Sequence, residues 1–552
     1  MSDKSRYLIK AKEAISQVYY DEYSGLLALP FPEIKFLTSS EENYVSGQYF
    51  ITIGDSWRIH LNFGKLPHSY KEFKEEVKVL TRHEIEHYQT CPYNVLTHFR
   101  MIQAILNVNS QKNKPVDDNT IRLLAPYIAN QIADIVIDTK LFQKNPWETL
   151  KSEIGWIKKG SLNAFQDVSR NGKLMFLLKE ALWREDLELY ESSKVLRSKV
   201  SLLEEIFNQG GIDNKEMVIR KTDAYSKAFL ELYELDRIDL ERRGGPGGNL
   251  DENLPSKNGA KGEADTILSD PDKIKDAINQ LAQETEIDDF IKILDAAGVK
   301  QLSDAEREMA WFEAQSVEEI PLYSNLTTAS NDEMSYPSTW RLEDPVEELD
   351  MLLTLQSIPR VIPGISTKKW QKEHTQNKNV ETKNSDLLLV IDTSGSMGDL
   401  KEEGSRLHEA VLASFGFVKY YEHKKAEVAL INFSSTKKVE AWTRDYDSIK
   451  KLLLFSWGQG TEFPVKDIKS FVEIKKDKMV IIVITDGKIQ NWENTFLLFK
   501  DLLHRENEIF IFIMDNNMAI DQYSKLEHLG GFVKNATSME EIRRIVFSQL
   551  IG

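Results

Sequence analysis

The chain of 552 residues contains a single cysteine, so no disulfide can form within it and a reducing compartment is expected. It also lacks any apolar run near the roughly 18 residues needed to span a bilayer. Its first residues, MSDKSRYLIKAKEA, lack the apolar core of a signal peptide. These absences predict a cytosolic protein with no membrane segment.

Basic residues are outnumbered, with 70 Lys and Arg against 87 Asp and Glu and a net charge of −17. A nucleic-acid partner needs an excess of basic groups to neutralise its phosphates, so direct nucleic-acid binding is not expected. The pattern GxxxxGK[ST] is absent, so the chain does not itself carry a P-loop ATPase. The hydrophobic content of 41% is nevertheless sufficient for true cores, and the length allows three domains.

The residue patterns divide the chain into four segments and predict a multidomain protein. Residues 1–240 have a mixed start followed mainly by helical patterns, which predicts a mainly α (α+β) domain. Residues 241–270, rich in Gly, Asn, Asp and Pro, are typical of a flexible linker, and residues 271–384 are acidic and helix-prone. Residues 385–552 alternate strand and helix patterns, as an α/β doubly wound, Rossmann-like fold requires.

The C-terminal segment contains a strand that runs directly into a polar turn, with the sequence LLVIDTSGSMG at residues 388–398. Ligands of open α/β sheets bind beyond the carboxyl ends of the strands, which is where Asp392, Ser394 and Ser396 are expected. Short oxygen-bearing side chains suit Mg²⁺ or Mn²⁺ rather than Zn²⁺. The turn therefore predicts a site for a hard divalent cation.

Two further segments of the C-terminal part are expected at the same place. The apolar run Met479–Thr485 predicts a second buried strand, and it ends at Asp486, whose carboxylate should emerge on the same edge of the sheet. Between the two strands lies the glycine-containing stretch Gly458–Glu462, which carries the hydroxyl of Thr461.

The patterns DxSxS, GxGT and TDG, in this order, resemble the von Willebrand factor A domain and its metal-ion-dependent adhesion site over about residues 385–552. The resemblance implies that Asp392, Ser394 and Ser396 bind the metal. It implies that Thr461 and Asp486 contribute directly or through water, and that an acidic residue of a protein partner fills the remaining position.

A second signal, of a different chemical kind, lies near the N-terminus, where residues 83–87 have the sequence HEIEH. They fall within Tyr70–Gln89, whose apolar residues recur at helical spacing, so a helix is predicted there. On a helix His83 and His87 are one turn apart, and both imidazoles can reach one tetrahedral Zn²⁺. Glu84 then lies beside the metal, where a carboxylate serves as the general base of a hydrolase.

A third zinc ligand is expected from Asp117–Phe142, which predicts a long helix. Asn130, Asp134 and Asp138 recur every four residues and form a polar stripe on this otherwise apolar helix. Because a buried carboxylate is costly unless it is paired or bound to a metal, the stripe favours a site at Asp134.

The segment ANQIADIVID, residues 129–138, resembles the second motif of a family of predicted bacterial metallopeptidases that also carry a C-terminal von Willebrand-like domain. The resemblance covers about residues 45–140 together with the C-terminal domain. It implies a zincin-like fold for the N-terminal domain and Asp134 as the third ligand, with Asp138 as the alternative.

Two residues of the predicted zinc helix depart from the extended zinc-peptidase pattern. Glu86 stands where active members usually carry an uncharged residue, and Gln89 stands where they tend to carry an apolar one. Both residues predict a helix that is more exposed to solvent than usual.

Two functions are compatible with these observations. The first is a cytosolic zinc metallopeptidase that acts on peptides or proteins and is presented to them by the adhesion-type domain. The second is a non-catalytic adaptor, since intracellular von Willebrand A proteins of bacteria commonly resemble partners of MoxR-type AAA+ ATPases. In the second hypothesis the N-terminal metal site is structural, and the Mg²⁺ site binds a carboxylate of the ATPase or its client.

Overall fold

The chain forms two compact units, Met1–Gln315 and Ser316–Gly552, and most of its described residues are helical. In the computed structural model the described residues are 3–23, 33–36, 49–52, 58–61, 69–159, 169–187, 189, 191, 193–242, 271–299, 302–316, 335–340, 368–372, 385–456, 458, 460–475, 477–515 and 523–551. The expected linker at 241–270 lies almost entirely outside these residues, and the boundary between the units falls inside the range 271–384.

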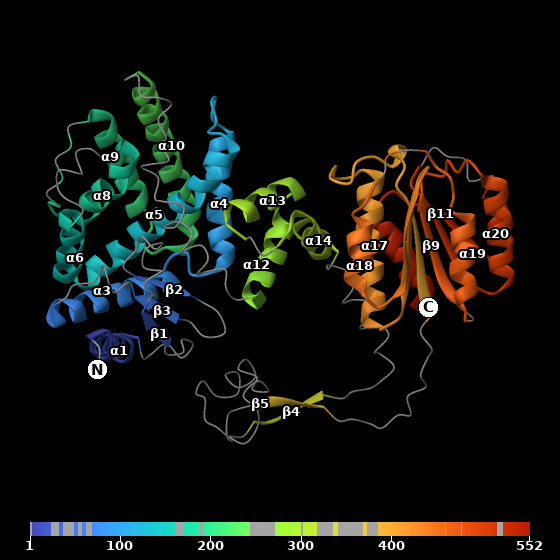
Figure 1. The fold of residues 1–552 in the computed structure, drawn as a ribbon, viewed down its shortest axis with the longest axis horizontal. Coiled ribbons are helices and arrows are strands. Elements are labelled where there is room, and N and C mark those ends of the chain that lie inside the picture. Colours follow the sequence, from blue (N-terminus) through green and yellow to red (C-terminus); the bar gives the residue numbers. More distant parts are fainter. Residues whose placement is uncertain are drawn as a thin grey trace. The chain divides into compact units, whose positions relative to one another are not determined.

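The first unit is built mainly from helices (Figure 1). Its elements are α1 (Asp3–Glu22), β1 (Glu33–Phe36), β2 (Tyr49–Thr52), β3 (Arg58–Leu61), α3 (Tyr70–Gln89), α4 (Val95–Ser110), α5 (Asp118–Lys144), α6 (Pro146–Lys159), α8 (Arg170–Trp183), α9 (Lys194–Asn208), the 3₁₀ turn η2 (Lys215–Met217), α10 (Val218–Arg242), α12 (Pro271–Glu284), α13 (Ile287–Ala296) and α14 (Asp304–Gln315). The three short strands form one sheet in which β3 is central, parallel to β1 and antiparallel to β2.

Helices α3 and α5 carry the residues of interest in the first unit, and both match their predictions closely. Helix α3 has the predicted bounds and buries Phe73, Val77 and Ile85 in a cluster shared with α1. Helix α5 begins after Asp117, whose side chain accepts a hydrogen bond from the Thr120 backbone N–H at 3.1 Å and so caps the helix. Helix α5 packs against α3, α4, α6, α8 and α10, which explains why it is apolar over most of its circumference.

The second unit contains a two-stranded ribbon and a six-stranded sheet. Its elements are β4 (Ser335–Thr339), β5 (Lys368–Lys372), β6 (Asp386–Asp392), the 3₁₀ turn η5 (Gly395–Met397), α17 (Arg406–His423), β7 (Val428–Phe433), β8 (Lys437–Thr443), α18 (Tyr446–Leu453), α19 (Val465–Ile474), β9 (Met479–Thr485), α20 (Trp492–His504), β10 (Glu508–Ile513), α21 (Ser524–Glu527), β11 (Phe532–Asn535) and α22 (Met539–Ile551). The ribbon pairs β4 and β5 antiparallel.

The six-stranded sheet has the order β11-β10-β9-β6-β7-β8, and only the edge strand β8 is antiparallel. The predicted strand Met479–Thr485 is confirmed with its exact bounds as β9, and it lies beside β6. Connections from β6 and β9 lead to opposite halves of the sheet, so their carboxyl ends border the point at which the strand order reverses. Open α/β sheets bind ligands at such a point.

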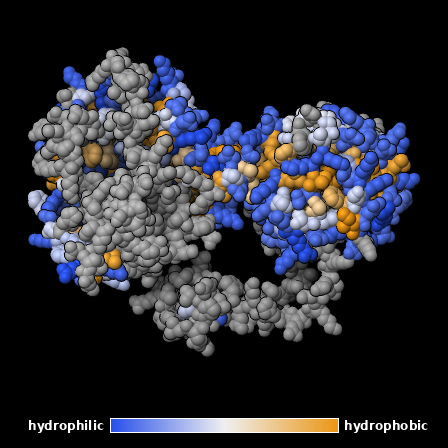
Figure 2. Space-filling view, viewed as in Figure 1, coloured by the Kyte–Doolittle hydropathy of each residue, from blue (hydrophilic) through white to orange (hydrophobic). Residues whose placement is uncertain are grey.

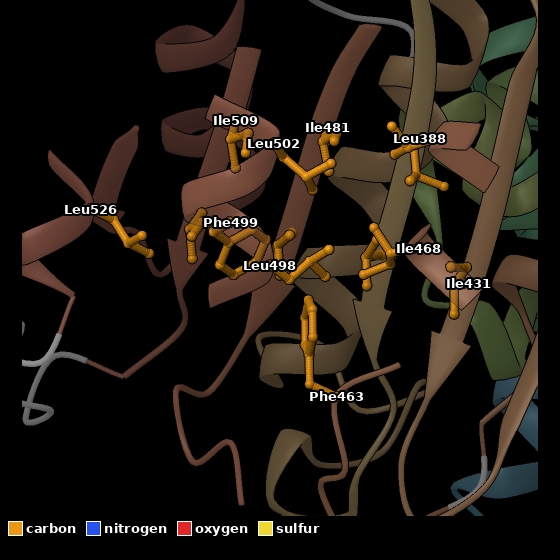
Figure 3. Close-up of a cluster of buried hydrophobic side chains, with 14 of the residues drawn as sticks. Leu388, Ile431, Phe463, Ile468, Ile481, Leu498, Phe499, Leu502, Ile509 and Leu526 are labelled. Atoms are coloured by element: carbon orange, nitrogen blue, oxygen red, sulfur yellow. The ribbon is translucent and has the colours of Figure 1, made fainter. Parts of the chain in front are cut away.

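Helices lie against both faces of this sheet (Figure 1). One face is covered by α19, α20 and α21, whose apolar side chains form a continuous core with alternate residues of the strands (Figure 3). Labelled members of this core include Leu388 and Ile481 from the sheet and Ile468, Phe499 and Leu526 from the helices. Strands β6 and β9 are buried on both faces, which accounts for their unbroken apolar sequences.

The described surface of the second unit is largely hydrophilic, with hydrophobic patches between the charged residues on the face in view (Figure 2). Among the described residues, none of the helices is both long and apolar enough to cross a membrane.

Candidate functional site

Three side chains of the first unit converge between helices α3 and α5. His83 and His87, one turn apart on α3, bring their Nε2 atoms within 3.2 Å of each other. The Oδ1 atom of Asp134, from the middle of α5, lies 3.3 Å from Nε2 of His83 and 3.6 Å from Nε2 of His87. The three atoms form a group that could hold a metal ion.

The spacing of these atoms fits a tetrahedral metal. With metal–ligand bonds of about 2.0 Å, the ligand atoms of a tetrahedral zinc site lie about 3.3 Å from one another. The three separations of 3.2, 3.3 and 3.6 Å are close to that value. The side chains are also 21%, 19% and 21% exposed, so the group is reachable from solvent.

The other nitrogen of each histidine is hydrogen-bonded to an acceptor. Nδ1 of His83 donates to Oδ1 of Asp138 at 2.8 Å, and Nδ1 of His87 donates to the carbonyl oxygen of Cys91 at 3.1 Å. An imidazole that carries its proton on Nδ1 presents the lone pair of Nε2. When the two rings are neutral, both lone pairs therefore point to the place where the rings meet, as metal ligation requires.

Burial and neighbouring charges shift the pKa values of this cluster in opposite directions. Burial opposes the charged form of His83, but the carboxylates of Asp138 and Asp134 outweigh it, so the pKa of His83 is raised well above its usual range. Burial and the charge of His83 lower the pKa of His87 to about 4. Burial raises the pKa of the adjacent Glu84 to about 7.

Asp134 and Asp138, the two carboxylates predicted as alternatives, occupy different places. Asp134 lies with the histidine Nε2 atoms, and its second oxygen accepts a hydrogen bond from the Asn130 amide at 3.1 Å. Asp138 contacts the far side of His83 and accepts a hydrogen bond from Lys179 at 2.6 Å. Asp138 is thus placed to orient a ligand, whereas Asp134 is placed to be one.

The prediction that Glu86 makes helix α3 more exposed is wrong. Glu86 is completely buried because it faces α5, where Lys140 and Lys144 lie 3.0 and 2.7 Å from its two carboxylate oxygens. Tyr23 and Thr90 donate further hydrogen bonds to the same carboxylate. Gln89 is also largely shielded, with its amide nitrogen buried.

In the second unit, the predicted turn after β6 brings its polar side chains together. The backbone N–H of Ser394 donates to Oδ1 of Asp392 at 2.9 Å, and the hydroxyls of Ser394 and Ser396 lie 3.2 Å apart. The other oxygen of Asp392 accepts a hydrogen bond from Thr485, the last residue of β9, at 2.7 Å. Asp392 is completely buried at the carboxyl end of its strand.

The remaining predicted residues of this group lie on neighbouring loops. The loop before α19 approaches the turn closely, since the Gly458 backbone N–H donates to the Thr393 carbonyl at 3.0 Å; Thr461 is buried three residues further along. A Cβ on Gly395 would lie 2.8 Å from the carbonyl oxygen of Gly458, so only glycine fits there.

Asp486 follows β9 directly and is completely buried. Its Oδ2 atom has no hydrogen-bond partner, although the ammonium group of Lys488 lies 3.4 Å away. A buried carboxylate oxygen that accepts no hydrogen bond is unusual, and a cation satisfies it.

Sequence reasoning missed several residues that contact these groups. In the first unit, Lys179 donates hydrogen bonds to both Asp138 and Glu153. In the second unit, Arg406 donates to the carbonyl oxygen of Ser396 at 3.1 Å. One signal was present for Lys179, which is a single cation within the apolar stretch LMFLLKEAL. For Glu153 and Arg406 the sequence offers no signal, because no motif links either residue to its partner.

No protein-family model and no curated protein matches the chain. Among solved structures it is similar to the pilus adhesin SpaC from Lactobacillus rhamnosus GG, in two crystal structures, one of them in an open conformation. Both matches have 15% identity and a TM-score of 0.27 over 32% of this chain, and they cover 31% and 30% of the adhesin chain.

The type V pili tip protein Mfa5 from Porphyromonas gingivalis is similar at 23% identity, with a TM-score of 0.18 over 19% of this chain and 20% of that one. Likenesses at these TM-scores support no assignment of fold or function.

Proposed function

We propose that the first unit is a zinc-dependent metallopeptidase in which His83, His87 and Asp134 bind the metal. The observation that carries this proposal is the arrangement of the three ligand atoms at tetrahedral spacing, with both histidine Nδ1 atoms engaged elsewhere. Zinc, when bound, lowers the pKa of water to about 7 and polarises a substrate carbonyl.

Glu84 is the proposed general base. It follows His83 on α3 and interacts electrostatically with both His83 and Asp134. Its carboxylate accepts a proton from the attacking water as the new bond forms between the water oxygen and the peptide carbonyl carbon. Glu84 then delivers that proton to the leaving amine when the C–N bond breaks, so it ends the cycle as it began.

The zinc proposal is tested by metal analysis of purified protein together with cleavage of a fluorescently labelled, unfolded protein. About one zinc per chain is expected in the wild type, and His83→Ala should abolish it. Glu84→Gln should keep the zinc but lose proteolysis, because only the base is removed. Glu75→Gln, an exposed position on the same helix, is the matched control.

Two results would contradict the peptidase. If the His83→Ala protein still holds its zinc, His83 is not a zinc ligand and the proposed site is wrong. If the Glu84→Gln protein still cleaves the substrate, Glu84 is not the general base and the proposed mechanism is wrong. A wild-type protein that binds zinc but cleaves nothing would favour the non-catalytic adaptor, with a structural zinc site.

For the second unit, we propose a von Willebrand factor A-type domain, with a doubly wound fold and a site for Mg²⁺ or Mn²⁺. Asp392, Ser394 and Ser396 would bind the ion, with Thr461 and Asp486 assisting. The strand order, the polar turn at the point where that order reverses and the buried Oδ2 of Asp486, which accepts no hydrogen bond, support the proposal. An acidic side chain of a protein partner, in particular a MoxR-type AAA+ ATPase, would complete the coordination.

The second site is tested by calorimetric titration of the full chain with Mg²⁺. Asp392→Ala should abolish Mg²⁺ binding but leave the zinc content unchanged, because the residue belongs to the other unit. Mg²⁺ binding that is unaffected by Asp392→Ala would contradict this assignment.

A further inference from the structure

A chain of polar contacts runs from His83 away from the proposed zinc, through Asp138 and Lys179 to Glu153. Asp138 accepts from Nδ1 of His83 with one oxygen, at 2.8 Å, and from the ammonium group of Lys179 with the other, at 2.6 Å. Lys179 also donates to Oε1 of Glu153 at 3.1 Å. The four residues come from α3, α5, α8 and α6, so the chain of contacts joins four helices.

Lys179 is the most deeply buried member of this chain. Its side chain is 4% exposed, against 14% for Asp138 and 13% for Glu153. Leu174 and Leu178 of the same helix are completely buried as well, so this part of α8 lies in the interior of the unit. A buried ammonium group is costly unless acceptors satisfy its hydrogen bonds, and here two carboxylates do so.

The position of Lys179 determines which way the Asp138 carboxylate faces. A carboxylate held by a strong hydrogen bond at one oxygen can turn only a limited amount about its side-chain bonds. With Oδ2 held by Lys179, Oδ1 stays directed at Nδ1 of His83, and Nε2 of His83 stays directed at Asp134 and His87.

We infer that Lys179 is a positioning residue of the metal centre, acting through Asp138 to hold His83 in its ligating orientation. This inference rests on the proposed zinc function. It assigns a role in zinc binding to a residue that touches neither the metal ligands nor substrate, and it places part of the site's support on helix α8.

The same helix supplies a matched control. Lys173 is also buried, and its ammonium group lies 3.0 Å from the carboxylate of Glu191. Lys173→Met therefore removes a buried lysine from α8 without touching Asp138 or His83. A loss of stability common to both variants can be separated from an effect on the metal.

The experiment measures zinc affinity by competition with a chromophoric chelator, and the visible absorption of the Co²⁺-substituted full chain. Lys179→Met should weaken zinc binding by about 10- to 100-fold, the usual effect of removing an outer-shell partner, and should alter the Co²⁺ spectrum. Lys179→Arg keeps the charge and the donors, so it should restore most of the affinity. Lys173→Met should leave affinity and spectrum unchanged.

A folded Lys179→Met protein with wild-type zinc affinity and an unchanged Co²⁺ spectrum would overturn the inference. If that variant does not fold, Asp138→Asn is measured instead; it keeps the size of the side chain and should weaken zinc by a similar factor, and wild-type affinity there would also overturn the inference. A wild-type chain that binds no zinc would instead overturn the proposed function, so the two failures are distinguishable.

Discussion

The carboxylate of Glu86 accepts a hydrogen bond from the ammonium group of Lys144 at 2.7 Å, and it does so with no exposure to solvent. This contact joins α3, which carries two of the proposed zinc ligands, to α5, which carries the third. Lys140 lies 3.0 Å from the other oxygen of Glu86 and reinforces the connection. The relative placement of the two helices, and with it the spacing of the ligand atoms, therefore depends on one buried carboxylate and two partly exposed lysines.

Glu86→Ala should lower the free energy of unfolding by about 2 kcal/mol, because two ammonium groups lose the carboxylate that they share. The loss is limited because the side chains of Lys140 and Lys144 are 20% and 49% exposed to solvent. Glu86→Gln should cost less, since the amide still accepts hydrogen bonds. The measurement is urea unfolding in EDTA, so that metal binding does not contribute. Glu75→Ala, on the exposed side of the same helix, should change stability by less than about 0.5 kcal/mol. Equal effects of the two alanine variants would contradict a structural role for Glu86.

Asp134 and Asp138 should respond differently to substitution. Asp134→Ala should abolish zinc retention, because its Oδ1 is one of the three converging ligand atoms. Asp138→Ala should leave zinc bound but weaken its binding by about 10- to 100-fold, because it removes the partner of His83 Nδ1 and none of the three ligand atoms. Zinc content and competition titration separate the two results. Complete loss of zinc in Asp138→Ala together with retention of zinc in Asp134→Ala would show that Asp138 is the ligand and Asp134 the orienting residue.

Periodicity and strand-end patterns were sufficient to locate the elements that carry both sites. The helix at Tyr70–Gln89 and the strand at Met479–Thr485 have their predicted bounds, because each is a long apolar pattern with a clear end. Local spacing also predicts that His83 and His87 meet, since one helical turn fixes their separation. Asp134 could be predicted near the two histidines only from the cost of burying a carboxylate and from the resemblance of residues 129–138 to a metallopeptidase motif.

Sequence patterns could not predict which charged residues form ion pairs between different helices. Glu86 was interpreted as a sign of exposure because a charged residue is usually solvated, yet its two lysines lie 54 and 58 positions further along the chain and pack against it. The role of Asp138 depends on Lys179, which belongs to another helix. Which charge pairs with which is set by helix packing, and no single-sequence pattern records it.

The only cysteine should be inert in the folded protein. Burial raises the pKa of the Cys91 thiol to about 12, so almost none of it is thiolate at pH 8, and its side chain is not exposed. Reaction with a disulfide reagent at pH 8 should be at least about a thousandfold slower than in guanidinium chloride, where the pKa returns to about 8.5. Because the chain has one cysteine, the released chromophore reports this residue alone. Similar rates in the two conditions would show that the turn after α3 opens readily.

Lys488 should compete with the divalent cation proposed for the second unit. Its ammonium group lies 3.4 Å from the Oδ2 atom of Asp486, which accepts no hydrogen bond, so a cation bound there meets a positive charge that must move away. Lys488→Met should therefore raise Mg²⁺ affinity by about three- to tenfold in calorimetric titration. The gain is modest because the lysine is half exposed, and it should shrink in high salt as screening increases.

Lys478→Met is the control for this prediction, because Lys478 is exposed and precedes the amino end of β9, at the opposite end of the strand from Asp486. It should leave Mg²⁺ affinity unchanged. A lower Mg²⁺ affinity in Lys488→Met would mean that the lysine supports the site, for example by holding Asp486 in place, instead of opposing the cation. A gain that persists undiminished in about 1 M salt would argue against a Coulombic origin, since the screening length there falls to about 3 Å.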